Sequence, residues 1–367
     1  MKVQQVAHLC IFVLFLLSSP ALSQEANSQK CIGSEPPPWS IADLRAALPE
    51  FKRIYVGRPQ GRNLHGIGIN HAFALWATIR YVKPLIVIES GVYMGQGTYF
   101  IRQAAGPEAA IYCLDPRHDH QLLEGNIYRD TSPRTSYYTG STFRDFGDLP
   151  WLQLIPQHAR ARTLLVLDDH MSAIKRVQQA LGFGFEHIWY EDNSGPDYSF
   201  GRMCSRRPVP LRVVYADNFG SVSHNISREE HEANVAYIKR RLKKYYEFPP
   251  IFTPYGSRQQ LLGREEAQNY WNSIRMSSPA CKELNFTRKR KRKCLLGIYG
   301  AEWSTAYPPY VQLHQGPIKD FVERTTPARL ACTGNRFSRV SGIGNKLKHE
   351  GALAIGVVPK GGCGGVR

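Results

Sequence analysis

The sequence lacks several features that would assign it to common functional classes. None of its eight cysteines belongs to a Cys-x-x-Cys pair, so the spacing typical of structural zinc sites is missing. Beyond the N-terminal segment, no apolar run is long enough to span a bilayer, and no internal repeat indicates a solenoid. These absences favour a globular domain without a structural zinc ion.

The net charge of +17 does not predict a nucleic-acid-binding protein, because the basic residues are concentrated outside the central part of the chain. Six consecutive basic residues occupy 288–293, and residues 311–367 contain nine basic and three acidic residues. Charge runs of this kind are commonly solvated. We interpret the run as a patch for acidic glycans or as a processing site, and expect no nucleic acid as a partner.

The first 23 residues have the three-part layout of a secretory signal peptide. Lys2 precedes an apolar run from Cys10 to Leu17, and Ala21-Leu22-Ser23 provides a cleavage site. Because the apolar run is short for a membrane span, cleavage is favoured over a retained anchor. We therefore expect a lumenal or secreted protein of the secretory pathway; the alternative is a signal-anchored membrane protein.

Cysteine and asparagine patterns agree with an oxidising compartment. Removal of the signal leaves seven cysteines, so at least one thiol is unpaired. Cys113 lies in an apolar, strand-like run and is expected to be that buried thiol. Cys281 and Cys294 bracket a short loop and are the candidates for a disulfide. Asn225 and Asn285 begin glycosylation sequons, although such triplets also occur by chance.

Alternating strands and helices predict an α/β domain with a Rossmann-like, doubly wound, mostly parallel sheet, since the strands are apolar on both faces. The expected strands are 85–88, 110–114, 136–139, 163–167, 186–190 and 295–299. The expected helices are 70–80, 98–104, 172–181 and 229–246. We expect an irregular N-terminal extension at 24–60, the Rossmann-like domain at 61–310, and a disordered basic tail at 311–367.

A glycine-rich turn between the first strand and the next helix is the strongest functional signal. It reads Val87-Ile88-Glu89-Ser90-Gly91-Val92-Tyr93-Met94-Gly95-Gln96-Gly97-Thr98, which is neither a P-loop nor the Gly-x-Gly-x-x-Gly fingerprint. Glycines permit sharp bends and close approach of backbone to a ligand, and the amides at a helix start attract anionic groups. Glu89, at the end of the strand, is placed to orient a ligand's amino group.

Asp115 ends the second strand, where a carboxylate can accept hydrogen bonds from both hydroxyls of a ribose. Together, the turn and this acid predict a nucleotide-type binding site. The alternative is an ordinary α/β turn with a capping acid.

Acidic residues also follow the fourth and fifth strands, as Asp168-Asp169-His170 and Glu191-Asp192. The carboxyl ends of parallel strands form the edge where open α/β sheets bind ligands. Clustered carboxylates suit Mg²⁺ or Ca²⁺, while helix capping by Asp169 and pairing with arginines are the alternatives. His170 is a candidate general base, or a hydrogen-bonded structural residue.

The motifs Val-Ile-Glu-Ser-Gly-Val-Tyr-x-Gly-x-Gly-Thr, Leu-Asp-Pro, Leu-Asp-Asp-His and Tyr-Glu-Asp-Asn resemble those of S-adenosylmethionine (SAM)-dependent O-methyltransferases. The resemblance covers about Pro84 to Asn193 and is strongest to the cephalosporin-hydroxylase-like and macrocin-type sugar or macrolide methyltransferases. It implies the class I methyltransferase fold. It also implies a set of SAM-binding residues, which are Glu89, Gly91, Gly95, Gly97 and Asp115. The Mg²⁺ ligands it implies are Asp168, Glu191 and Asp192.

Two hypotheses follow for the function. The first is a SAM-dependent O-methyltransferase of the secretory pathway that acts on a small-molecule or glycan hydroxyl, with His170 and Asp169 as catalytic residues. The second is a non-catalytic secreted or surface protein, in which the methyltransferase-like domain is a scaffold and the basic segments bind acidic glycans. An enzyme that uses a nucleotide other than SAM is a third interpretation.

Overall fold

The computed structural model describes residues 37–59, 66–116, 127–191, 209–223, 226–251, 260–277 and 309–315. Several predicted features lie outside these residues: the signal segment, both sequon asparagines, Cys281 and Cys294, the basic run, Asp192 and residues 316–367 of the tail. Within the described residues, no helix is both long and apolar enough to cross a bilayer.

Seven strands of the described chain form one sheet, in the order β3-β2-β1-β4-β5-β7-β6. Their bounds are β1 Ile86–Ser90, β2 Ala110–Asp115, β3 Thr135–Thr139, β4 Thr163–Leu167, β5 His187–Tyr190, β6 Leu242–Glu247 and β7 Pro309–Leu313. The first five strands are parallel, and β7 runs antiparallel between β5 and β6. The predicted doubly wound, mostly parallel sheet is therefore confirmed.

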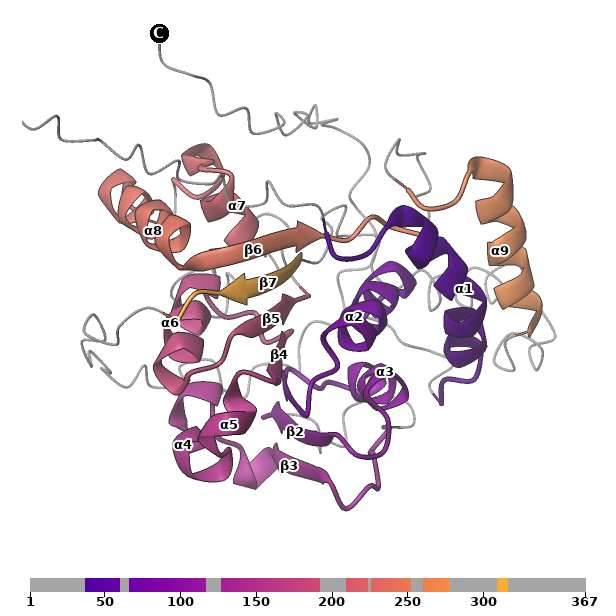
Figure 1. The fold of residues 1–367 in the computed structure, drawn as a ribbon, viewed down its shortest axis with the longest axis horizontal. Helices are drawn as coiled ribbons and strands as arrows, with labels where there is room; N and C mark the ends of the chain where they lie inside the picture. The colour runs from indigo at the N-terminus through magenta and orange to yellow at the C-terminus, as the bar shows by residue number, and fades with distance from the viewer. Residues whose placement is uncertain are drawn as a thin grey trace, which may run out of the picture. The chain divides into compact units, whose positions relative to one another are not determined.

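Helices cover both faces of this sheet (Figure 1). They are α1 Ile41–Val56, α2 Ile69–Val82, α3 Gln96–Ala105, α4 Trp151–Leu154, α5 Gln157–Arg160, α6 Ala173–Phe183, α7 Leu211–Tyr215, α8 Arg228–Arg241 and α9 Arg264–Ser277. Three short 3-10 helices are Gly140–Thr142, Phe146–Asp148 and Phe219–Ser221. Helices α1, α2, α3 and α9 contribute to the core on one face, and α4 to α8 contribute to the core on the other.

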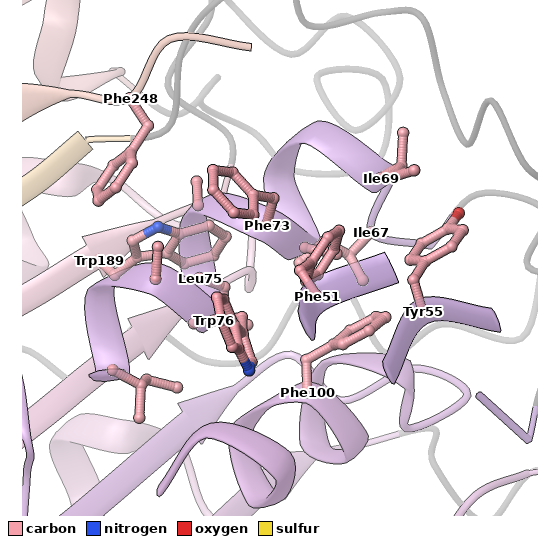
Figure 2. Packing of buried hydrophobic residues seen from close by; sticks show 14 of the residues in the cluster. Phe51, Tyr55, Ile67, Ile69, Phe73, Leu75, Trp76, Phe100, Trp189 and Phe248 are labelled. Atoms are coloured by element: carbon pink, nitrogen blue, oxygen red, sulfur yellow. The ribbon is translucent and has the colours of Figure 1, made fainter. Parts of the chain in front are cut away.

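The alternation of side chains along each strand divides the core in two. Val87, Val166 and Trp189 point to the face of α1, α2 and α3, whereas Ile88 and Leu165 point to the opposite face. Figure 2 shows the first of these clusters, in which aromatic rings from α1, α2, α3 and β5 pack together. Both faces of the strands are thus buried, as their near-continuous apolar composition predicts.

The segment predicted as an irregular extension contains a helix, so that prediction is wrong for its described part. Helix α1 begins with a capping box in which Ser40 and Asp43 bond each other's backbone amides, and Pro49 lies within it. Leu44, Leu48, Phe51 and Tyr55 recur at helical spacing and are all buried. Burial of this apolar stripe outweighs the cost of the internal proline.

The C-terminal boundaries also differ from the prediction. The expected helix 229–246 ends at Arg241 as α8, and β6 follows at once because Leu242, Tyr245 and Tyr246 are buried in a strand paired with β7. Strand β7 crosses the predicted start of the tail at residue 311, so residues 311–313 belong to the sheet. The predicted strand 295–299 lies outside the described residues.

Two smaller expectations concern single residues. Helix α2 begins after Gly68 rather than at Asn70, whose side-chain Oδ1 instead accepts a hydrogen bond from the Ile251 amide at 2.9 Å. Cys113 is fully buried in β2 as a free thiol, as predicted. Asn70 therefore links α2 to the chain that follows β6 instead of capping the helix.

Candidate functional site

The glycine-rich turn joins β1 to α3 with a backbone that requires glycine at two positions. Gly91 and Gly95 have φ angles of 95° and 83°. A Cβ atom at Gly91 would lie 2.1 Å from the carbonyl oxygen of Asp168, and one at Gly95 would lie 2.1 Å from that of Tyr128. The sequence suggested that glycine makes room for a ligand. The structure shows that these two glycines make room for neighbouring backbone of the chain itself.

Asp115 holds the turn from the end of β2. Its Oδ2 accepts hydrogen bonds from the amides of Val92 at 2.9 Å and Tyr93 at 2.7 Å. The carboxylate is 7% exposed. The Asp115 side chain is thus held against the turn itself. Its expected bonds to ribose stay a prediction.

A small pocket of about 20 Å³, partly open to solvent, lies beside the turn. It is bounded by the turn, the start of α3, the segment before α2, and side chains of β4 and β5. The lining residues are Gly66, Ile67, Leu75, Glu89, Gly91, Val92, Tyr93, Met94, Gln96, Gly97, Val166, Asp168 and Trp189. Ile67, Leu75 and Trp189 also belong to the aromatic core in Figure 2, so one wall of the pocket is fixed by the packing of the domain.

The pocket lies where the winding of the sheet reverses. Strands β1 and β4 are neighbours, although the chain between them forms β2 and β3 on the far side of β1. Helices after neighbouring strands then cover opposite faces, which leaves a crevice at the carboxyl ends, where ligands of this fold class bind. Four of the predicted site residues line it, namely Glu89, Gly91, Gly97 and Asp168. Gly95 and Asp115 are not among the lining residues.

Glu89 is the most deeply buried acid of the pocket, with 2% of its surface exposed. Its Oε2 accepts hydrogen bonds from the Thr98 hydroxyl at 2.5 Å and from the Cys113 thiol at 3.7 Å. Its Oε1 lies against Gly97, where an added Cβ would approach it to 2.3 Å. Burial raises the pKa of Glu89 to about 8, although both donors favour the ionised form.

Asp168 and Asp169, the consecutive acids after β4, make contacts on opposite faces of the sheet. Asp168 lines the pocket. The Asp169 side chain instead accepts a hydrogen bond from the Ser90 hydroxyl at 2.6 Å and pairs with Arg176 of α6 at 2.7 Å. The alternative weighed from sequence, pairing with an arginine, is therefore what the structure shows for Asp169. Its assignment as a catalytic residue is wrong, because these bonds hold the carboxylate away from the pocket.

Arg176 is the centre of this second cluster and is 1% exposed. Its guanidinium binds both oxygens of Asp145, at 2.7 and 2.9 Å, and also the Gln179 side chain at 2.8 Å. Burial works against ionisation, but the bonds and charge of Arg176 lower the pKa of Asp145 to about 2. We assign the cluster a structural role in fixing the loop between β4 and α6.

His170 and Glu191 lie at the same edge but are not brought together as a metal site. His170 is half-buried and adopts a left-handed backbone conformation with φ of 55°. Glu191 follows β5 and lies 2.7 Å from Nδ1 of His71 on α2. No group of three or more potential metal ligands occurs among the residues that the structure describes, and Asp192 lies outside them. We therefore derive no step through Mg²⁺.

Sequence reasoning missed three residues of this site. Gln96 is buried and donates from Nε2 to the carbonyl of Ile67 at 2.9 Å, which ties α3 to the segment before α2. Ile67 lines the pocket, and His71 binds the predicted ligand Glu191. The sequence predicted the helix at 70–80, but it did not show that the first turn of this helix contacts the end of β5.

Comparisons with known proteins find weakly similar solved structures and no relative by sequence. No protein-family model matches the sequence, and no curated protein matches it. Among solved structures, CmcI-N160 in its apo form is 10% identical, with a TM-score of 0.31, and the match covers 63% of this chain and 85% of that one. The cyclopropane-fatty-acyl-phospholipid synthase-like protein of Lactobacillus casei is 13% identical, with a TM-score of 0.29 and coverage of 73% and 98%.

Human N-acetylserotonin methyltransferase, solved in complex with SAM, is 12% identical, with a TM-score of 0.24 and coverage of 45% of this chain and 44% of that one. Alignments this weak assign no function. The strand order and the antiparallel β7 are the decisive features. The chain has the class I methyltransferase fold.

Proposed function

We propose that this protein is a SAM-dependent O-methyltransferase. The observation that carries the proposal is the acidic lining of the pocket: among the described residues that line it, Glu89 and Asp168 are the only acidic or basic side chains, and both are acids. Such a pocket favours a cationic ligand and disfavours phosphates. SAM fits this requirement, because it is a nucleoside that carries a sulfonium and an ammonium group and no phosphate.

The start of α3 offers a site for the remaining charged group of SAM. Gln96 and Gly97 line the pocket in the first turn of this helix, whose leading amides lack partners within the helix. A carboxylate is stabilised by such amides and by the helix dipole. The acids of the pocket therefore match the ammonium group of an amino-acid ligand, and the start of α3 matches its carboxylate. Asp115 stays the proposed partner of the ribose.

Bound SAM would supply an electrophilic methyl group for displacement by an acceptor hydroxyl. The chain's own contribution would be alignment of the two reactants and exclusion of water. His170 lies in the loop that follows β4 at this edge, and we retain it as the proposed acceptor of the hydroxyl proton. Asp169 is removed from this proposal, because Arg176 and Ser90 hold it.

Calorimetric titration of the full-length protein with SAM tests the proposal. We expect SAM to bind, S-adenosylhomocysteine to compete, and ATP and NAD to bind at least tenfold more weakly because their phosphates are repelled by Asp168 and cannot pair with Glu89. Gly91→Ala should abolish binding, since a Cβ collides with the Asp168 carbonyl. Absence of any SAM heat, or tighter binding of a phosphate-bearing nucleotide, would overturn the assignment.

Transfer is measured separately with tritiated SAM and simple hydroxyl acceptors, such as methyl β-D-glucopyranoside and catechol. Product formation supports the enzyme. SAM binding without transfer to any sugar or phenol would favour the non-catalytic scaffold instead.

We further propose that the protein works in the secretory pathway on a glycan hydroxyl. Support comes from the sequence, namely the signal-like residues 1–23 and the two sequons. Mass spectrometry of the mature N-terminus after expression in a secreting cell provides the test. A chain that begins after Ser23 and carries N-linked sugar supports the proposal, and an unprocessed cytosolic chain would contradict it.

A further inference from the structure

Glu89 is a buried acid that no cation of the described chain neutralises. No ion pair is formed with this carboxyl by any described lysine, arginine or histidine, and its hydrogen-bond donors, Thr98 and Cys113, are neutral. A carboxylate with 2% exposure and no counter-ion among the described residues is strongly disfavoured in its charged form. The geometry alone therefore favours a protonated Glu89 in the ligand-free protein.

The surrounding groups reinforce this state. Strand β2 contributes Cys113 and Asp115, and the charge of Asp115 raises the pKa of Glu89 further. Burial raises the pKa of the Tyr137 phenol on β3 and of the Cys113 thiol, and the charge of Glu89 raises both pKa values further. Next to β4, the pocket is lined by a second acid, Asp168. Helix α2 contributes His71, whose imidazole pairs with Glu191. Apart from His71, these groups are acidic or neutral.

The position of the acidic proton follows from the hydrogen bonds. Oε2 already accepts from Thr98 and Cys113, so in the neutral carboxyl the proton resides on Oε1, the oxygen that lies against Gly97. Gly97 and Glu89 both line the pocket. An ammonium group placed at Oε1 cannot coexist with this proton, because both would occupy the same acceptor.

We infer that Glu89 is a proton-coupled cation receptor: the carboxyl is neutral in the empty pocket and releases its proton to solvent when an ammonium group of the ligand binds. The inference rests on the proposed SAM function for the identity of the ligand, and it adds a coupling that this function does not require. One O–H bond of Glu89 is lost, the proton passes to buffer, and the resulting carboxylate pairs with the ammonium. The ligand itself is unchanged.

The coupling predicts that affinity for SAM depends on pH. The ligand's α-amino group stays charged below about pH 7.7, so between about pH 5.5 and 7 only Glu89 changes state on binding. If only the ionised carboxylate binds, affinity rises about tenfold for each pH unit in that interval. Glu89→Gln keeps an acceptor for Thr98 but has no proton to release, so its weaker affinity should be independent of pH.

The experiment is isothermal titration of the full-length protein with SAM near pH 6.5 in two buffers, phosphate and Tris, whose protonation enthalpies differ. The difference in binding heat gives the number of protons released. We expect about one proton for the wild-type protein and none for Glu89→Gln. Glu108→Gln removes an exposed carboxylate and is the matched control, and it should release the same number as the wild-type protein. Equal heats in both buffers for the wild-type protein would overturn the inference.

A second readout needs no ligand. Carbon-13 NMR of glutamate side-chain carboxyls follows the titration of Glu89, which is assigned as the signal lost in Glu89→Gln. We expect it to stay neutral at pH 7, and titration near the ordinary value of 4.5 would refute the coupling. If SAM produces no heat in either buffer, the proposed function fails, and the NMR titration still decides the state of Glu89.

Discussion

Arg176, which is buried, and Asp169, which is partly buried, form an ion pair with a separation of 2.7 Å on the face of the sheet opposite to the pocket. This contact separates the roles of two consecutive acids. Asp168 is left to line the pocket, while Asp169 and its partners fix the loop that carries His170. The compact Asp-Asp-His motif is thus one pocket residue, one structural residue and one candidate base.

Replacement of Arg176 by methionine should strongly destabilise the fold. Asp145 and Asp169 would keep their partly buried positions without the guanidinium that compensates both charges, which costs about 3–5 kcal/mol in the free energy of unfolding. Urea denaturation measures this loss. Arg144→Met removes an exposed arginine one residue from Asp145 and should change stability by less than about 0.5 kcal/mol. Equal stability of the two variants would contradict the structural role of Arg176.

Substitution of Asp115 tests whether its carboxylate stabilises the glycine-rich turn. Asp115→Ala leaves the amides of Val92 and Tyr93 without their acceptor, so we expect a loss of about 1–3 kcal/mol together with loss of SAM binding. Asp115→Asn retains one side-chain oxygen and should lose less stability. Thermal denaturation and calorimetry report the two effects, with exposed Asp148→Ala as the control. Full SAM affinity in Asp115→Ala would show that the turn does not need this acid.

The contact between Gly97 and Glu89 predicts a non-additive pair of substitutions. In Gly97→Ala the new methyl group collides with Oε1, so the variant should lose about 1–3 kcal/mol of stability. Removal of the carboxylate in Glu89→Ala relieves that collision. The double variant should therefore lose less stability than the sum of the losses in the two single variants. Gly57→Ala meets only ordinary contacts of 3.4 Å or more and serves as the control. Additivity of the two losses would exclude the collision.

The stability of the ligand-free protein should fall with rising pH because of Glu89. Its pKa is raised from 4.5 to about 8 on folding, so the native state holds an extra proton between these values. The associated stability is present below the unfolded value of 4.5 and is lost as pH rises through the folded value of about 8. Between pH 5 and 9 the wild-type protein should lose roughly 1–4 kcal/mol more than Glu89→Gln. Chemical denaturation across this range checks the slope. Parallel pH profiles of the two proteins would count against a raised pKa.

Local patterns predicted most of the sheet. Strand β4 was expected at its observed bounds, and β1, β2, β3 and β5 within two residues, because buried parallel strands are apolar on both faces. Helix α1 was missed, since Pro49 obscured a sound capping box and a helical apolar stripe. Residues 242–246 were assigned to a helix because the charged pattern of α8 continues into them, whereas pairing with β7 makes them a strand.

The sequence by itself determined the doubly wound domain, the glycine turn and the acids at the strand ends, since each of these follows from local composition and strand periodicity. Only the tertiary structure decided what each acid contacts. Asp115 meets the turn amides, Asp169 meets Arg176, and Glu89 is closed off from any cation of the described chain. The side-chain partners of Asp169 and Glu89, and therefore their charge states, come from helices and strands on either side of the sheet, whose approach no single segment encodes.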